Sequence, residues 1–112
     1  MSPYRSVYAT FKDLDQAKEI AHKIVEEGLV ACVNIVPQIT AIYRWEGKIE
    51  EDTEAAFFAK TQQHLIQQVT ARIAQLHTYE TPCIVVLPIE SGHQPYLDWI
   101  SGSLTRDPAT TR

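Results

Sequence analysis

The chain has 112 residues, a length at which one domain can bury a hydrophobic core without metal or disulfide staples. Its apolar share of 45% and charged share of 21% are those of a globular protein, and its net charge of −4 disfavours a phosphate-backbone ligand. No apolar run approaches the roughly 20 residues that a membrane-spanning helix needs, so neither nucleic acid nor membrane is an expected partner.

The first elements expected are a strand and a helix. Apolar residues alternate from Val7 to Phe11, which predicts the strand. Asp13 suits the cap of the helix, with Gln16 at the third helical position as in a capping box. Apolar residues then recur at helical spacing until Gly28, a residue typical of the position just after a helix.

The second strand is unusually long. Apolar residues occupy the odd positions 31, 33, 35, 39, 41, 43 and 45, and this period of two predicts a strand with one buried face. Strands usually run about 5–6 residues, so the far part of this one should project beyond the domain's own core. Pro37 has no amide donor and therefore marks a bulge or an edge position within the strand.

A tight turn and a returning strand follow. Glu46-Gly47 fits a two-residue hairpin loop, and the next strand runs from residue 48 to about residue 61. A two-stranded ribbon is marginal when it stands alone in water. We therefore expect Tyr43 and Trp45 to pack on another copy of the chain.

The remaining elements complete a recognisable order. Helical spacing recurs from Leu65 to Leu76, and the continuous apolar run 83–87 predicts a strand covered on both faces. Pro95 begins a short third helix that includes Ile100. The order β-α-β-β-α-β is that of the ferredoxin-like split βαβ, so the expected fold class is α+β, with two helices on one face of an antiparallel sheet.

One domain and a cytoplasmic location are expected. The domain spans residues 1–112, with an ordered core at about 4–104 and a frayed tail after it. The N-terminus enters the first strand without a signal-peptide core. Cys32 and Cys83 show no metal-finger spacing, so reduced thiols are the default.

Five short motifs occur in a distinctive order. They are Ala31-Cys32-Val33-Asn34, Tyr43-Arg44-Trp45-Glu46-Gly47-Lys48, Lys60-Thr61, His77-Thr78-Tyr79-Glu80-Thr81-Pro82 and Tyr96-Leu97-Asp98-Trp99. Through them the chain resembles the CutA divalent-cation-tolerance family over residues 5 to 104. The resemblance implies a ferredoxin-like protomer with an extended β-hairpin and a short C-terminal helix, in a homotrimer whose hairpins pack between subunits. It also implies metal-ion tolerance and copper binding.

The chain departs from the family where some members are associated with copper. Ala9 stands at the position of their first-strand cysteine, and their doubled histidine is Leu76-His77 here. Thr78 replaces the usual proline, and Cys83 stands where many members have glutamate. Only His77 remains of that copper site, so the site cannot be transferred whole.

His77 is the central candidate for a metal ligand. Neutral imidazole commonly binds Cu, Zn and Ni, and the Glu80 carboxylate could assist it. The alternative is a histidine placed favourably at a helix C-terminus. Cys32 is the weaker third candidate, as a thiolate for Cu(I) or as a buried structural cysteine. The expected cofactor is Cu(II) or another divalent cation, with ligands that adjacent subunits could share.

An acidic run over residues 50–54 opens the returning strand. Alternation sends its carboxylates to both faces, so a solvated or salt-bridged ribbon is favoured over a cage for a divalent cation. The two-residue turn places Tyr43 opposite Glu50 and Trp45 opposite Lys48. These pairs predict a seam between subunits, with buried rings and charges paired at its rim.

The function expected is metal-ion tolerance by a homotrimer that binds ions such as copper without catalysis, since no nucleophile–base pair is evident. A cleft between protomers should be shaped by Trp45, Tyr43, Tyr79, Lys60 and Glu54. The alternative is a PII-like trimeric scaffold that senses a small effector between subunits or engages an unidentified protein partner. Phosphate-cradling Gly-rich motifs are absent, which weighs against a nucleotide effector.

Overall fold

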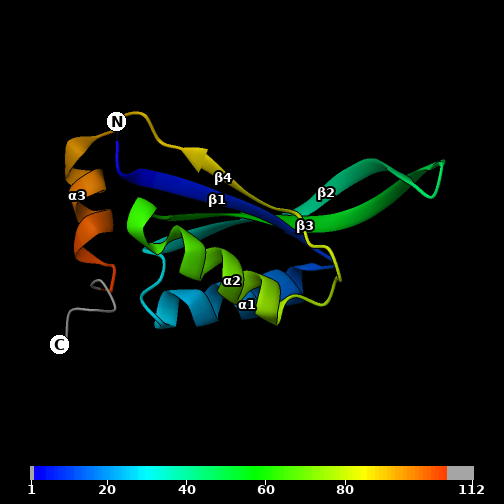
Figure 1. Ribbon diagram of the computed structural model, residues 1–112, viewed down its shortest axis with the longest axis horizontal. Coiled ribbons are helices and arrows are strands. Elements are labelled where there is room, and N and C mark those ends of the chain that lie inside the picture. Colours follow the sequence, from blue (N-terminus) through cyan, green and yellow to red (C-terminus); the bar gives the residue numbers. More distant parts are fainter. Residues whose placement is uncertain (1, 106–112) are drawn as a thin grey trace.

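The computed structural model describes residues 2–105, so the expected frayed tail lies almost wholly outside the described residues. Within this range the elements are β1 (Tyr4–Phe11), α1 (Leu14–Glu26), β2 (Cys32–Trp45), β3 (Lys48–Gln62), α2 (Ile66–Leu76), β4 (Ile84–Pro88) and α3 (Gln94–Gly102), as Figure 1 shows. A single 3₁₀ turn, Gln63–Leu65, leads into α2. The order β-α-β-β-α-β, followed by a short helix, confirms the predicted ferredoxin-like α+β fold.

The strands form one antiparallel sheet in the order β2-β3-β1-β4. Helices α1 and α2 lie on the same side of this sheet, and we call the other side the open face (Figure 1). The prediction that the apolar run in β4 is covered on both faces is wrong for the single chain. β4 is an edge strand that pairs only with β1, and Val85, Val86 and Leu87 are 36–46% exposed.

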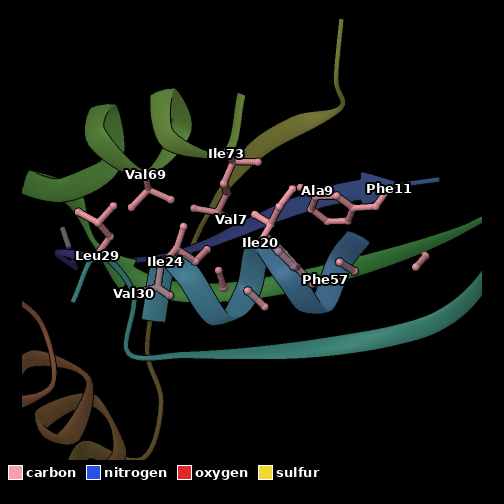
Figure 2. Packing of buried hydrophobic residues seen from close by; sticks show 14 of the residues in the cluster. Val7, Ala9, Phe11, Ile20, Ile24, Leu29, Val30, Phe57, Val69 and Ile73 are labelled. Carbon is pink, nitrogen blue, oxygen red and sulfur yellow. The ribbon is translucent and has the colours of Figure 1, made fainter. Parts of the chain in front are cut away.

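The core lies between the sheet and the two helices, as Figure 2 shows. Phe11 of β1 and Phe57 of β3 are fully buried, with ring centroids 4.6 Å apart. Ile20 and Ile24 of α1 and Ile73 of α2 close over them. Each side chain of this size contributes about 1.5–3 kcal/mol when it is fully buried, so this layer holds the helices on the sheet.

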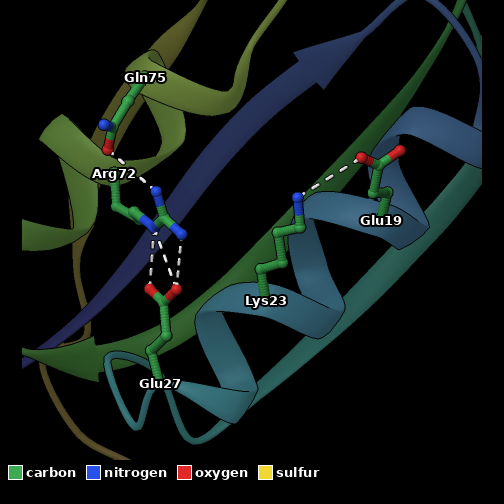
Figure 3. Close-up of polar contacts among 5 residues, drawn as sticks. All are labelled: Glu19, Lys23, Glu27, Arg72 and Gln75. Atoms are coloured by element: carbon green, nitrogen blue, oxygen red, sulfur yellow. Dashed lines mark hydrogen bonds and ion pairs between the residues drawn. The ribbon is translucent and has the colours of Figure 1, made fainter.

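Both ends of α1 have the predicted local chemistry. The Asp13 carboxylate accepts a hydrogen bond from the Gln16 amide at 2.9 Å, which caps the first turn. Gly28 follows the helix with a φ of +73°, a conformation that favours glycine. Beside this end, Arg72 of α2 donates three hydrogen bonds to the Glu27 carboxylate, at 2.9, 3.1 and 2.7 Å (Figure 3). The pair ties the two helices together.

β2 and β3 continue beyond the rest of the sheet as a two-stranded ribbon, and the molecule is 47 Å long (Figure 1). Glu46 and Gly47 form its turn with φ values of 48° and 80°, as a two-residue hairpin loop requires. The predicted register is confirmed, because Tyr43 lies opposite Glu50 and Trp45 lies opposite Lys48.

A bulge at Pro37 changes the face to which β2 directs its side chains. Ile35 lies opposite the core residue Phe57, whereas Ile39 lies opposite Glu54, so β2 carries one extra residue between them. One extra residue moves every later side chain to the other face. The prediction that the odd positions share one buried face is therefore wrong beyond the bulge. The odd residues moved to the open face are Ile39, Ala41, Tyr43 and Trp45.

Candidate functional site

A cleft of about 820 Å³ lies on the open face, where the ribbon leaves the sheet. Three parts of the chain line it: the ribbon, the open-face side chains of β1, and the segment 79–83 between α2 and β4. Its volume falls in the range of small-molecule sites, about 300–1,000 Å³. The bulge directs the odd residues of the ribbon toward the open face at a place that α1 and α2 leave uncovered. The helix α3 packs on the other end of this face, where Tyr4 clusters with Leu97 and Ile100.

Two tyrosine–carboxylate pairs organise the polar part of the cleft. Tyr43 donates its hydroxyl hydrogen to Asp52, and Tyr79 donates to Glu54 at 2.9 Å. The hydrogen bond to Asp52 raises the pKa of Tyr43 to about 12. Burial, followed by the hydrogen bond to Glu54, raises the pKa of Tyr79 to about 12. Both phenols therefore remain protonated donors at neutral pH.

His77 lies at the end of α2 and supports the wall of the cleft from behind. Its side chain is buried, with the ring stacked on Phe11 at a centroid distance of 5.0 Å. Nε2 is 2.7 Å from the Thr10 carbonyl oxygen, and Nδ1 accepts a hydrogen bond from the Tyr79 amide at 3.1 Å. Both ring nitrogens are therefore already engaged in the single chain.

Cys32 and Lys60 lie at the opposite end of the sheet. They face each other across β2 and β3, beside Ser6 of β1. Thr10, which contacts His77, is four residues further along β1, or about 13 Å at the usual rise per residue. The Cys32 thiol is 3.2 Å from the Tyr96 hydroxyl.

Lys60 does not line the cleft. Its ammonium donates instead to the Asn34 side chain, because both residues lie at the end of the sheet remote from the ribbon. The other four residues that were predicted for a cleft between protomers line this cleft of the single chain, as does Glu80; they are Trp45, Tyr43, Tyr79 and Glu54. The cleft between protomers itself stays a prediction.

The structure does not gather the three predicted metal ligands. Glu80 lies in the cleft wall, His77 behind that wall, and Cys32 at the far end of the sheet. Within residues 2–105, no group of three or more His, Cys, Asp or Glu side chains is close enough to hold a metal ion. One copy of the chain therefore does not form a closed metal site, and the ligand roles stay predictions.

Sequence reasoning did not assign Tyr8, Thr10, Asp52 and Cys83 to the cleft, although the structure places all four in its lining. The signal for the first two was available, because the alternation that sends Val7 to the core sends Tyr8 to the other face. For Asp52 the signal was the acidic run. Cys83 gave no such signal, since its place depends on β4 being an edge strand.

Comparison with known proteins places the chain among relatives of one kind. The family of CutA1 divalent ion tolerance proteins matches residues 5–103. "Protein CutA" of Mus musculus is 45% identical over 95 residues, 85% of this chain and 54% of the relative. "Divalent-cation tolerance protein CutA" of Thermus thermophilus is 46% identical over 94 residues, 84% of this chain and 91% of the relative. The chain thus spans about half the length of the relatives from Mus musculus, Homo sapiens and Bos taurus.

Solved structures agree with this grouping. The divalent cation tolerance protein Cut A1 from Thermus thermophilus superposes with a TM-score of 0.88 at 42% identity, covering 91% of this chain and 99% of that one. CutA1 from Oryza sativa gives a TM-score of 0.90 at 38% identity, with 93% and 95% covered. No helix within residues 2–105 is long and apolar enough to cross a membrane.

Proposed function

The chain belongs to the CutA1 divalent ion tolerance family, and on that premise we propose that it acts in tolerance to divalent cations as a homotrimer that binds ions such as copper without catalysis. The observation that carries the proposal is the cleft at the base of the ribbon. It combines carboxylates, phenols and a thiol on a part of the open face that α1 and α2 leave uncovered. A neighbouring copy that covered this face would complete the site.

Self-association is supported by where the exposed apolar side chains lie. Ile49 and Trp45 on the ribbon are 63% and 62% exposed, and β4 adds a second apolar stretch at the opposite edge of the sheet. Large apolar side chains left exposed favour contact with a partner, and unpaired edge strands invite pairing with another chain. A contact between one edge and the other would be head-to-tail, and such contacts can close into a ring.

Cation binding is proposed in the assembled cleft rather than in one copy. Asp52, Glu54 and Glu80 supply oxygen ligands that suit hard divalent cations, and the Cys83 thiol suits softer ions such as copper. These groups do not form a closed site in the single chain. Donors from neighbouring copies would raise the number of ligands to the four or more that divalent cations usually take.

Titration of Cu(II) and Zn(II) by calorimetry tests this proposal, with Glu54→Gln, Glu80→Gln and the remote control Glu26→Gln. Even the outer partners of metal ligands change affinity by about 10–100-fold, so loss of a ligand should weaken binding at least tenfold. We expect both cleft variants to lose this much and the control variant to bind as the native chain does. Equal, weak and non-integer binding in all four proteins would contradict the proposal.

A second candidate function is favoured by the size and lining of the cleft. A PII-like trimeric scaffold would bind a small effector there and pass the signal to a protein partner. A cleft of about 820 Å³ with several aromatic walls fits such an effector better than a bare ion. A thermal-shift panel separates the two candidates, because stabilisation by AMP or ATP but not by copper would favour the scaffold.

We also propose a cytoplasmic location for this chain. Both cysteines are free, as reduced compartments maintain them. The relative from Arabidopsis thaliana is named a chloroplastic protein, so location varies among relatives. Fractionation of the source cells, followed by detection of the chain with an antibody, checks this location.

A further inference from the structure

The hydrogen bonds around His77 specify the protonation state of its ring. The Tyr79 amide can only donate, so Nδ1, 3.1 Å away, must accept and carries no hydrogen. The Thr10 carbonyl can only accept, so Nε2, 2.7 Å away, must carry the hydrogen and donate. The ring is therefore the neutral Nε2–H tautomer.

The His77 imidazole makes a hydrogen bond to β1 that a continuing β4 strand would otherwise make. The Thr10 amide donates to the Cys83 carbonyl at 3.3 Å, as the last rung between β1 and the β4 segment. The Thr10 carbonyl bonds the histidine ring instead, because the pairing of β1 with β4 ends at Ala9 and Ile84. Thr10 is buried, so its carbonyl would otherwise lose a hydrogen bond that water cannot readily replace.

The same ring holds the wall of the cleft. Its Nδ1 receives the Tyr79 amide, and the Tyr79 ring packs on it at a centroid distance of 4.8 Å. From that position the Tyr79 hydroxyl reaches Glu54 across the cleft. Gln16 of α1 secures the preceding residue through a 2.7 Å hydrogen bond to the Thr78 hydroxyl.

A cation bound to His77 would disrupt this arrangement at either nitrogen. At Nδ1 it would displace the Tyr79 amide, and at Nε2 it would displace the hydrogen that satisfies the Thr10 carbonyl. His77 as a whole is also only 9% exposed, and Phe11 covers one face of its ring. Coordination would therefore cost at least one buried hydrogen bond as well as access through the wall.

We infer that His77 is a positioning residue: as the neutral Nε2–H tautomer it holds Tyr79 on the cleft wall and does not itself bind the cation. This inference rests on the proposed role of the cleft in binding. The claim that His77 positions Tyr79 can be tested without any metal, since the tautomer of His77 and the order of the cleft wall can be measured in the metal-free protein.

The test begins with protein labelled with ¹⁵N in its imidazole rings. Long-range ¹H–¹⁵N correlation spectra should show a protonated Nε2 and an unprotonated Nδ1 for His77, with both shifts unchanged when Zn(II) is added to saturation. A protonated Nδ1, or a zinc-induced shift of either nitrogen to a metal-bound value, would overturn the inference.

Two variants separate positioning from ligation. In His77→Gln the side-chain amide can still donate to Thr10, whereas His77→Phe keeps a ring against Phe11 without any hydrogen bond. Hydrogen exchange at the Tyr79 amide should accelerate about tenfold in His77→Phe, as expected for loss of one buried hydrogen bond. Zinc affinity should stay within about threefold of the native value in His77→Gln, well short of the change that loss of a ligand causes.

The outcomes distinguish this inference from the proposed function. Loss of zinc binding in His77→Gln with unchanged exchange at Tyr79 would make His77 a ligand and refute positioning. If the native chain binds no zinc, the proposed function fails, and the tautomer and the exchange rates still decide whether His77 positions the wall.

Discussion

The clearest prediction concerns Ile49, which lies on the ribbon outside the protomer's own core. Its side chain is 63% exposed in the single chain. It lies opposite Arg44 across the ribbon, so Ile49→Glu would place a carboxylate beside a guanidinium and remain well solvated in an isolated protomer. For a monomer this is a surface substitution, with an expected change within about 0.5 kcal/mol.

The expectation is different if a second copy covers the ribbon. Full burial of an isoleucine side chain contributes about 1.5–3 kcal/mol, and the exposed 63% represents about 1–2 kcal/mol that each copy gains on assembly. Ile49→Glu would forfeit that gain and add the cost of burying a carboxylate. We therefore expect the variant to dissociate at concentrations where the native chain is assembled.

Light scattering during size-exclusion chromatography over a dilution series measures this effect. The matched control is Val25→Glu on α1, where a 41% exposed valine lies on the helical side away from the ribbon. We expect Val25→Glu to keep the native mass while Ile49→Glu shifts toward a single chain. Equal masses for the two variants at every concentration would refute the claim that the ribbon is an interface.

Three further predictions concern the turn, the helix pair and the cleft. Gly47→Ala should destabilise the chain by about 1 kcal/mol in urea unfolding because Gly47 has a φ of +80°, whereas Gly102→Ala, in α3, should not. The hydrogen bond from Arg72 lowers the pKa of Glu27, so the pair stabilises the chain above the ordinary glutamate pKa of about 4.3 and loses this effect as the pH falls through the lowered pKa. Arg72→Ala should therefore reduce the Tm at pH 7 but hardly at pH 2. Equal reductions at the two pH values would contradict this. Asp52→Asn should return the pKa of Tyr43 from about 12 toward 10, as measured by ¹³C NMR of the Tyr43 ring. An unchanged pKa would exclude Asp52 as the cause of the raised value.

Features governed by neighbouring residues could be predicted from the sequence. The Asp13 cap, the Glu46-Gly47 turn and the register that pairs Tyr43 with Glu50 each depend on a few consecutive residues with restricted geometry. The fold class followed because the order of helical and strand periodicities allows few topologies. These predictions are confirmed by the structure.

The two errors about the sheet arose from effects that act over longer distances. Pro37 predicted a bulge or an edge position, but not that a bulge would move the later odd residues to the other face, because alternation alone does not show the extra residue. The apolar run in β4 resembles a strand covered on both faces, and periodicity does not reveal which strand lies at an edge. In both cases the missing information was how the strands pair with one another, not which residues form strands.

Only those parts of the candidate site that depend on local strand pairing could be predicted from the sequence. Tyr43, Trp45 and Glu54 share the ribbon, so their proximity followed from the hairpin register. The engagement of both nitrogens of His77 depends on the Thr10 carbonyl, 67 residues away in the chain, and no local pattern shows such a contact. Its position behind the cleft wall is therefore a finding of the structure.

Native mass spectrometry of the purified chain, with and without Cu(II), tests the central claim most directly, since one spectrum reports both the number of chains and the number of bound ions. We predict a mass of three chains, with an integer number of copper ions that survives dilution. A single-chain mass, or a trimer that retains no copper under these conditions, would contradict the account of a trimer that binds divalent cations between its copies.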